Sequence, residues 1–214
     1  MSGARLGPTE VIEEALDDGE AVIPESDATN ALIMTPADAP SHRAVCGGLL
    51  SALAPVKVLG VALKHDDAYY AELCQEYMDE RPVDIGVVHV GGDGTGSRMP
   101  DENVTAVSEP SDLTGTGIRI TNYLKEFAGG GPTVVCFDSL TPLLQYVDVD
   151  RCYRFLDMTT RRIDQVCSVS HAHLNPGAHD DQTVETISAV FDTVVEPAGP
   201  DDDEVVPGWT VRPT

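Results

Sequence analysis

Lysine is scarce in this chain of 214 residues, which holds only three, at positions 57, 64 and 125. Basic residues number 13 against 36 acidic ones, so the formal net charge is −23 at pH 7. A surface with this charge repels nucleic-acid phosphates and anionic lipid headgroups, which argues against autonomous binding to nucleic acid or membrane. No run approaches the roughly eighteen apolar residues that a membrane-spanning helix needs.

Aromatic residues are also few, at 5% of the chain. An acidic excess spread over the whole sequence, with little lysine, is typical of proteins adapted to molar salt, where screening shortens charge repulsion to a few ångströms. We therefore infer a halophilic, archaeal protein. Residues 1–19 carry acidic side chains where an export signal has a basic start and an apolar centre, which predicts a cytoplasmic location.

Cysteine pairs of the C-x-x-C type are absent. The five cysteines are odd in number and widely spaced, at positions 46, 74, 136, 152 and 167. This spacing favours reduced thiols over disulfides or a zinc ribbon. Cys136 and Cys167 fall inside expected strands and are interpreted as small core residues.

Short β-branched runs alternate with helix-like stretches, which predicts an α/β domain with a mainly parallel sheet. Strands are expected at 30–35, 56–63, 84–90, 103–107, 133–138, 166–171 and 192–196. Helices are expected at 41–53, 66–80, 116–128, 140–163 with a break near Asp148, and 180–191. A single domain, 1–214, comprises an N-terminal helix and linker (1–27), a core (28–196) and an acidic, proline-rich tail (197–214) in which Trp209 anchors an edge strand.

The run TVVCFDS ends an apolar strand with Asp138 and Ser139, the form of a Walker B element whose carboxylate reaches a magnesium ion. The matching phosphate loop, G-x-x-x-x-G-K-[ST], should follow the first strand and open a helix. Residues 36–43 hold that position but read PADAPSHR, without glycine or lysine. Proline offers no amide hydrogen, so the phosphate cradle is missing. If nucleotide binding survives, its candidate residues are His42, Arg43, Asp138 and Ser139.

Three runs carry a resemblance to known proteins: SDLTGTGIRITNYL (111–124), CFDSLTPLLQYVDVDRCYRFLD (136–157) and SHAHLNPGAHDDQTVETISAVFDTVVE (170–196). Together they resemble a family of small haloarchaeal proteins called HTR-like, which are similar to KaiC and RecA in fold. The resemblance implies a RecA/KaiC-like (P-loop NTPase-like) core with a degenerate Walker A loop. Such ATPases carry a catalytic glutamate just after the second core strand, whereas residues 63–67 read LKHDD and offer only aspartate.

The segment SHAHLNPGAHDD concentrates histidine and aspartate and raises the question of a metal site. His171 and His173 are two apart, so on a strand they share a face. His179 and Asp180 follow a turn, and these four residues are the candidate ligands. Without a complementary ligand elsewhere, the alternative is a set of histidines bonded to loop carbonyls and helix ends.

Four of the ten arginines, Arg151, Arg154, Arg161 and Arg162, cluster in one expected helix. In so acidic a chain this cluster is a candidate docking surface for an acidic partner or a second copy. The leading prediction is therefore a non-catalytic regulatory or scaffold protein that acts through protein contacts and needs no cofactor. One alternative is an ATP-binding or ATP-hydrolysing enzyme that uses Mg-ATP at an atypical loop. Another is a metal-dependent hydrolase that uses the H-x-H segment.

Overall fold

A computed structural model describes residues 29–35, 43, 45–48, 50, 56–78, 84–92, 99–100, 103–129, 131, 133–166, 169–197 and 209–214. These residues form an eight-stranded sheet in the order β4-β3-β2-β5-β6-β1-β7-β8. The strands are β1 (Thr29–Met34), β2 (Lys57–Ala62), β3 (Asp84–Val90), β4 (Val104–Val107), β5 (Thr133–Asp138), β6 (Val169–Leu174), β7 (Thr193–Pro197) and β8 (Trp209–Pro213). All neighbouring strands are parallel except the β7–β8 pair. The predicted α/β class and the edge strand around Trp209 are confirmed.

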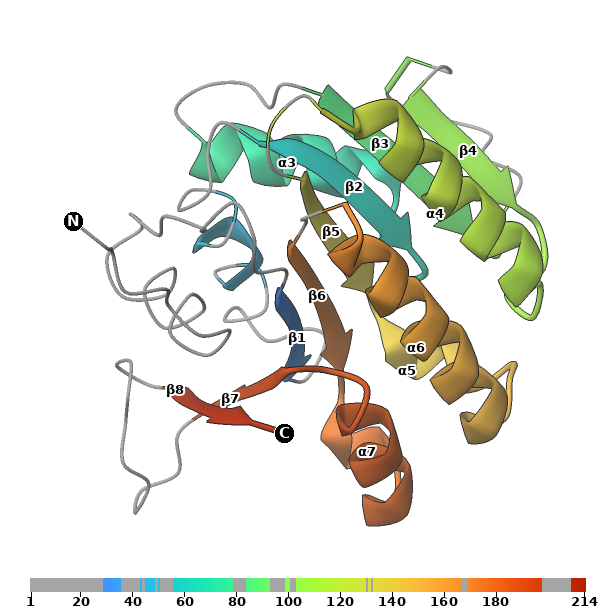
Figure 1. Ribbon diagram of the computed structural model, residues 1–214, viewed down its shortest axis with the longest axis vertical. Coiled ribbons are helices and arrows are strands. Elements are labelled where there is room, and N and C mark those ends of the chain that lie inside the picture. Colours follow the sequence, from blue (N-terminus) through green and yellow to red (C-terminus); the bar gives the residue numbers. More distant parts are fainter. Residues whose placement is uncertain are drawn as a thin grey trace.

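Helices cover both faces of the sheet (Figure 1). They are α3 (Asp67–Tyr77), α4 (Leu113–Phe127), α5 (Leu140–Leu143), α6 (Val149–Asp164) and α7 (Asp181–Ser188), with a 3-10 turn at Pro176–Ala178. The helices α4 to α7 pack on one face in a core with Leu32, Phe137 and Ala172. On the other face, α3 and the helical residues 43, 45–48 and 50 pack on a second core. The sheet is therefore buried on both faces, which explains its nearly continuous apolar strands.

Short polar side chains set the helix boundaries. Asp112 accepts a hydrogen bond from the Gly115 amide, so α4 begins at Leu113, three residues before the start expected at 116. Asp148 accepts from the Arg151 amide and opens α6, which confirms the predicted break. Each cap satisfies an amide that the first helical turn leaves without a partner, and this fixes the start of the helix.

The sixth strand begins later than predicted. The apolar residues from 166 suggested a strand over 166–171, but pairing with both β1 and β5 begins only at Val169 and continues to Leu174. The reason is that α6 runs on to Asp164, which leaves residue 166 in the connection. His171 therefore lies in the middle of β6 rather than at its end, and only His173 is close to the carboxyl edge.

Gly60 allows α3 to approach the centre of the sheet. A Cβ atom at Gly60 would lie 2.6 Å from the Tyr70 ring, closer than carbon atoms can pack. Tyr70 is fully buried on this face. A glycine in a strand interior is otherwise unfavourable, so its role here is to seat a large ring from the helix directly on the backbone.

At the centre of the sheet, between β2 and β5, the order in which successive strands are added reverses. The strand β2 leads through α3 to β3 on one side, whereas its neighbour β5 leads through α5 and α6 to β6 on the other. The connections that leave these two strands therefore diverge. In open parallel sheets such a switch point, at the carboxyl ends of the strands, is where ligands bind. The residues that follow β2 and β5 are thus the first place to look for a site.

Several predicted features lie outside the described residues. They are the N-terminal helix within 1–27, the loop residues 36–42 with His42, the cysteine at 167, and the tail segment 198–208. No helix in the described ranges is long and apolar enough to span a membrane.

Candidate functional site

Asp138 and His65 meet at the switch point between β5 and β2. Nδ1 of His65 is hydrogen-bonded to Oδ2 of Asp138, whose side chain has no exposed surface. The Asp138 carbonyl also accepts from the amides of Leu63 and Lys64, at 2.7 and 3.0 Å, so the loop after β2 is tied to the end of β5. The Asp138 carboxylate, predicted to occupy a Walker B position, is thus engaged by a histidine from the loop after the neighbouring strand β2.

Tyr69 extends this arrangement towards the helical residues that follow β1. Its ring stacks on His65 with 4.1 Å between ring centroids and 9° between the planes. The Arg43 guanidinium lies over the same ring, 5.2 Å from its centroid, and also pairs with Glu76 at 2.8 Å. Burial raises the pKa of the Tyr69 hydroxyl, and the negative groups around it add to that rise. The ring is therefore a neutral surface on which both a cation and an imidazole rest.

The candidate nucleotide residues come together only in part. Asp138 and Ser139 are adjacent, and Arg43 reaches their neighbourhood through Tyr69 and His65. The Ser139 hydroxyl donates to the His173 carbonyl at 3.0 Å and accepts from the Thr141 amide at 3.3 Å, which makes it the N-cap of α5. Each of these side chains is thus engaged in contacts within the protein.

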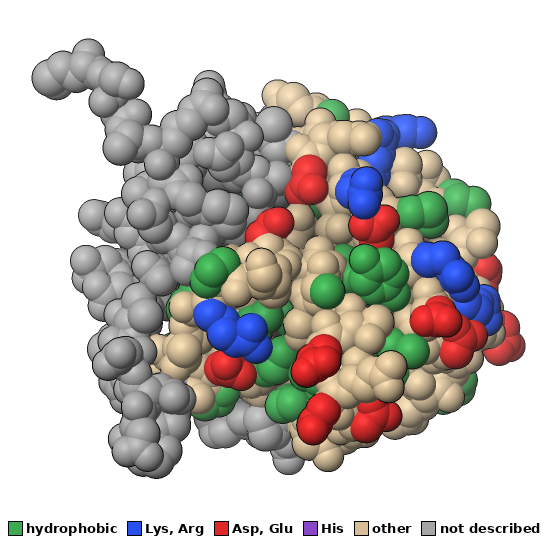
Figure 2. Space-filling view, turned by 60° about the horizontal axis from the view of Figure 1, so that its bottom comes forward, with side chains coloured by type: hydrophobic (Ala, Val, Ile, Leu, Met, Phe, Trp, Pro, Cys, Tyr) green, Lys and Arg blue, Asp and Glu red, His purple; other side chains and the backbone are tan. Residues whose placement is uncertain are grey.

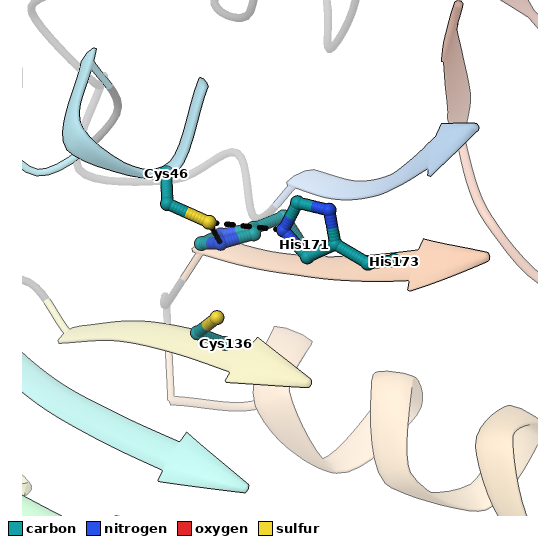
Figure 3. A group of neighbouring side chains, drawn as sticks. All are labelled: Cys46, Cys136, His171 and His173. Carbon is teal, nitrogen blue, oxygen red and sulfur yellow. Dashed lines mark hydrogen bonds between the residues drawn. The ribbon is translucent and has the colours of Figure 1, made fainter. Parts of the chain in front are cut away.

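A second group of chemically active side chains lies nearby on the same face of the sheet. It consists of Cys46, Cys136, His171 and His173, shown in Figure 3 and called here the Cys/His cluster. One potential ligand atom from each residue lies within 4.8 Å of the other three, and all four side chains are buried. The Cys46 Sγ atom is 2.9 Å from Nε2 of His173 and 3.2 Å from Nε2 of His171.

Strand register and strand parity assemble this cluster. The alternation of side chains along β6 points His171 and His173 to the same face. In the β5–β6 pairing Cys136 is the direct neighbour of His171, which places its thiol beside the first imidazole. Cys46 approaches from the helical residues that cover this face. Three separate parts of the chain therefore contribute to one buried centre.

The two thiols in the cluster are not equivalent. Burial alone would raise the pKa of Cys46, but the hydrogen bond from Cys136 and the neighbouring His173 and His171 lower it well below its usual value. The pKa of Cys136 is raised well above its usual value by that same hydrogen bond to Cys46 and by burial. The hydrogen bond between the two thiols and the adjacent imidazoles therefore make Cys46 the more acidic thiol of the pair.

Of the four candidate metal ligands, the structure brings together only two. His171 and His173 belong to the Cys/His cluster. His179 lies with Nε2 3.2 Å from the Thr141 hydroxyl, and partial burial lowers its pKa. Asp180 accepts from the Thr183 amide at 2.8 Å as the N-cap of α7, and this hydrogen bonding lowers its pKa. The predicted alternative of histidines bonded to loops and helix ends thus describes His179 but not the two strand histidines.

Sequence reasoning missed Cys46, Cys136 and His65. The alternation of side chains along β5 offered one signal for Cys136. This residue lies two positions before Asp138 and therefore faces the same side of the sheet. Nothing in the spacing of Cys46, 125 residues from His171, indicates the contact between them. Its interpretation as a free thiol is correct for the described part of the chain, but its position is decided by helix packing.

The arginines predicted as an interface lie on α6, beside an apolar groove. This groove, of about 390 Å³, is lined by Leu113, Thr114, Gly117, Ile118, Ile120, Thr121, Asn122, Lys125, Phe155, Met158, Thr159 and Arg162. An adjoining recess is lined by Leu113, Thr114, Arg151, Arg154, Phe155 and Met158. We call the two together the α4–α6 groove. Its apolar residues include Ile118 and Met158, which are 55% and 67% exposed.

Three of the four arginines border this groove. Arg151 and Arg154 line one end, Arg162 lines the other, and Lys125 adds a fourth positive charge from α4. Arg161 instead pairs with Asp157 at 2.9 Å and does not line the groove. Figure 2 shows that basic and acidic side chains are interspersed with exposed hydrophobic ones on the face drawn there. The surface is therefore not uniformly acidic, despite the overall charge.

No curated protein matches this sequence. Among solved structures, a protein from Pyrococcus horikoshii OT3, studied as project PH0250, superposes with a TM-score of 0.54 at 11% sequence identity. The superposition covers 89% of this chain and 87% of the other, so the two share a fold. The family of unknown function DUF7504 matches residues 28–197, which is most of the chain, and the protein belongs to that family.

Proposed function

We propose that this protein is a non-catalytic RecA/KaiC-like domain that regulates or scaffolds a protein partner through the α4–α6 groove. The observation that carries the proposal is the exposed apolar floor of the groove, bordered by arginine and lysine on an acidic protein. Exposed patches with a polar rim mark interaction sites on soluble domains.

The layout of the sheet supports the RecA/KaiC-like part of the proposal. In the sequence, β1 is followed by residues 36–42, where the phosphate loop was expected, and then by the helical residues that pack on the same face of the sheet as α3. Asp138 ends β5, and β6 lies between these two strands. The carboxyl ends of β1 and the Asp-ended strand β5 therefore lie at the same edge of the sheet, which fits the predicted ATPase-like core.

The polar side chains at the carboxyl edge of the sheet are bonded to other side chains of the protein, and this supports a non-catalytic role. A Walker B carboxylate must reach a magnesium ion through water. Here Asp138 is buried against His65, and the Arg43 guanidinium is paired with Glu76. The sequence of the loop also lacks the glycines that wrap backbone amides around phosphate.

The shape and charge of the α4–α6 groove fit an acidic amphipathic helix on the partner. An apolar trough between two neighbouring helices accepts the apolar face of a third helix, with anchors about one helical turn apart. Its basic rim complements acidic residues beside those anchors. In molar salt the charge attraction is screened, so the floor around Phe155 and Met158 supplies most of the affinity and the rim sets the register.

The test is crosslinking from the groove in cells of the source organism. A photoreactive amino acid placed at Met158, which is exposed, should capture one dominant protein whose crosslinked peptide forms an acidic amphipathic helix. The double reversal Arg151→Glu and Arg154→Glu should reduce that capture at least about tenfold, since two rim contacts become repulsive.

A matched control separates the groove from the overall charge. The double reversal Arg161→Glu and Arg212→Glu changes the net charge equally, but neither arginine lines the groove. Capture should survive in this variant. Equal loss of capture in both variants refutes the proposal, and so does a protein with the unaltered rim that captures nothing above background. Crosslinking to a second copy of this chain would show that the groove serves self-association and does not bind a partner helix.

The alternative of a metal-dependent hydrolase lacks support from the described residues. Its three histidines would have to face one ion, but His179 contacts Thr141 and is outside the Cys/His cluster. Hydrolysis also needs an open coordination position for water, whereas the two remaining histidines are fully buried.

A further inference from the structure

We propose that Cys46, Cys136, His171 and His173 form a closed structural zinc site. The ion would join the helical residues that follow β1 to the neighbouring strands β5 and β6. This site is independent of the α4–α6 groove, which lies on the opposite face of the sheet.

The distances within the cluster are close to those of a tetrahedral site. With Zn–S bonds of about 2.3 Å and Zn–N bonds of about 2.0 to 2.1 Å, tetrahedral ligand atoms lie roughly 3.3 to 3.8 Å apart. The potential ligand atoms all lie within 4.8 Å of one another, with Cys46 Sγ 2.9 and 3.2 Å from the two imidazole nitrogens. An ion would therefore move these atoms by a few tenths of an ångström to about one ångström, which side-chain rotation supplies.

The charge of such a site suits its burial. Two thiolates and two neutral imidazoles around Zn²⁺ carry no net charge. The ion enters as the two cysteines release two protons in total, so the charge balances without any further group. The four side chains have at most 2% exposed surface. A neutral complex avoids the large cost of burying an isolated charge.

The ligand chemistry and the burial together select zinc in a structural role. Two sulfurs and two imidazoles in a tetrahedral arrangement are typical of zinc rather than of magnesium, calcium or manganese, which prefer oxygen. Catalytic zinc keeps one position open to water, whereas all four positions here are filled by buried side chains. The ion would instead hold a helix to the sheet, because Cys46 is the only member of the cluster outside the strands.

The proposal is tested on the full chain, expressed without a histidine tag and purified in molar KCl. Elemental analysis should find about one equivalent of zinc, and a mercurial reagent that blocks thiols should release it. Replacement by Co²⁺ should give the intense visible bands of a tetrahedral ion together with a near-ultraviolet thiolate-to-cobalt charge-transfer band.

Matched cysteine variants locate the metal. Cys46→Ser and Cys136→Ser should each lower bound zinc to less than about a tenth of an equivalent after dialysis against a mild chelator. Cys74→Ser is the control, because Cys74 is buried on the same face but is not part of the cluster. It should retain the full equivalent. His171→Asn should weaken the cobalt bands while leaving the two thiols in place.

Three results would overturn the proposal. One is folded wild-type protein that holds less than about a tenth of an equivalent of zinc even after incubation with the ion. Another is zinc that stays bound in the double variant Cys46→Ser and Cys136→Ser. The third is copper or iron in the native protein with no uptake of zinc. Because the first and third tests use the unaltered chain, they decide the question even if a ligand variant fails to fold.

Discussion

Asn30 of β1 is hydrogen-bonded to α6, to β6 and to the residue before β7 at the amino edge of the sheet, and the substitution Asn30→Asp tests how much these bonds contribute to stability. Its Nδ2 atom donates to Asp164 at 2.7 Å and to Asp192 at 3.3 Å, and its Oδ1 accepts from Ser170 at 2.5 Å. The side chain is 2% exposed. The substitution keeps the size of the side chain but replaces a donor with a third carboxylate.

The expected loss of stability is about 4 kcal/mol at neutral pH. Two hydrogen bonds to charged acceptors disappear, each worth about 1.5 kcal/mol at the low end of the usual range, for a total of about 3 kcal/mol. The low end applies because solvent reaches both acceptor residues, Asp164 and Asp192. Repulsion among the carboxylates adds about 1 kcal/mol after allowance for solvent screening.

The loss should depend on pH in a defined direction. Partial burial raises the pKa of Asp164, the hydrogen bond from Asn30 opposes that shift, and Asp192 adds to it. In the variant, the introduced carboxyl is buried beside these two and its folded-state pKa is raised above the ordinary value. A carboxyl with a raised folded-state pKa destabilises the folded state increasingly as the pH rises. The defect should thus be full at pH 7 and shrink as the pH falls towards about 4.

Urea unfolding followed by circular dichroism in molar KCl measures the effect. The double variant Asn30→Asp with Asp164→Asn restores one donor–acceptor pair with the roles exchanged, and should recover at least about 1 kcal/mol. A defect below about 1 kcal/mol, or one that stays constant between neutral and acidic pH, would refute the reasoning.

Two further predictions concern the nucleotide and the salt. ATP binding should be absent in calorimetry with Mg-ATP in molar KCl, because the loop 36–43 lacks glycine and lysine and Asp138 is bonded to His65; a micromolar dissociation constant abolished by Asp138→Ala would contradict this. The melting temperature should fall on transfer from molar KCl to dilute buffer, where the charge of −23 is no longer screened. The melting temperature is measured by circular dichroism in both buffers, and an unchanged value would argue against adaptation to salt.

The sequence by itself determined the elements and their class. Short β-branched apolar runs bounded by turn residues predicted the strands, and the break near Asp148 predicted where α6 begins. These signals are local, because the composition of a short strand and the capping of a helix each depend on a few neighbouring residues. The break in the helix near Asp148 and the edge strand at Trp209 were predictable for the same reason. The late start of β6 was not, since the length of the preceding helix decided it.

Only the tertiary structure decided which side chains meet. His65 reaches Asp138 because β2 and β5 are neighbours, although 73 residues separate the two in sequence. Cys136 lies beside His171 because the β5–β6 register pairs them, and a shift of one residue would turn the thiol to the other face. The position of Cys46 beside the two histidines depends on how helices pack on the sheet. The same packing decides which arginines of α6 line the groove and which do not. Sequence periodicity fixes the face on which a residue lies, whereas strand order, register and helix packing choose its neighbours.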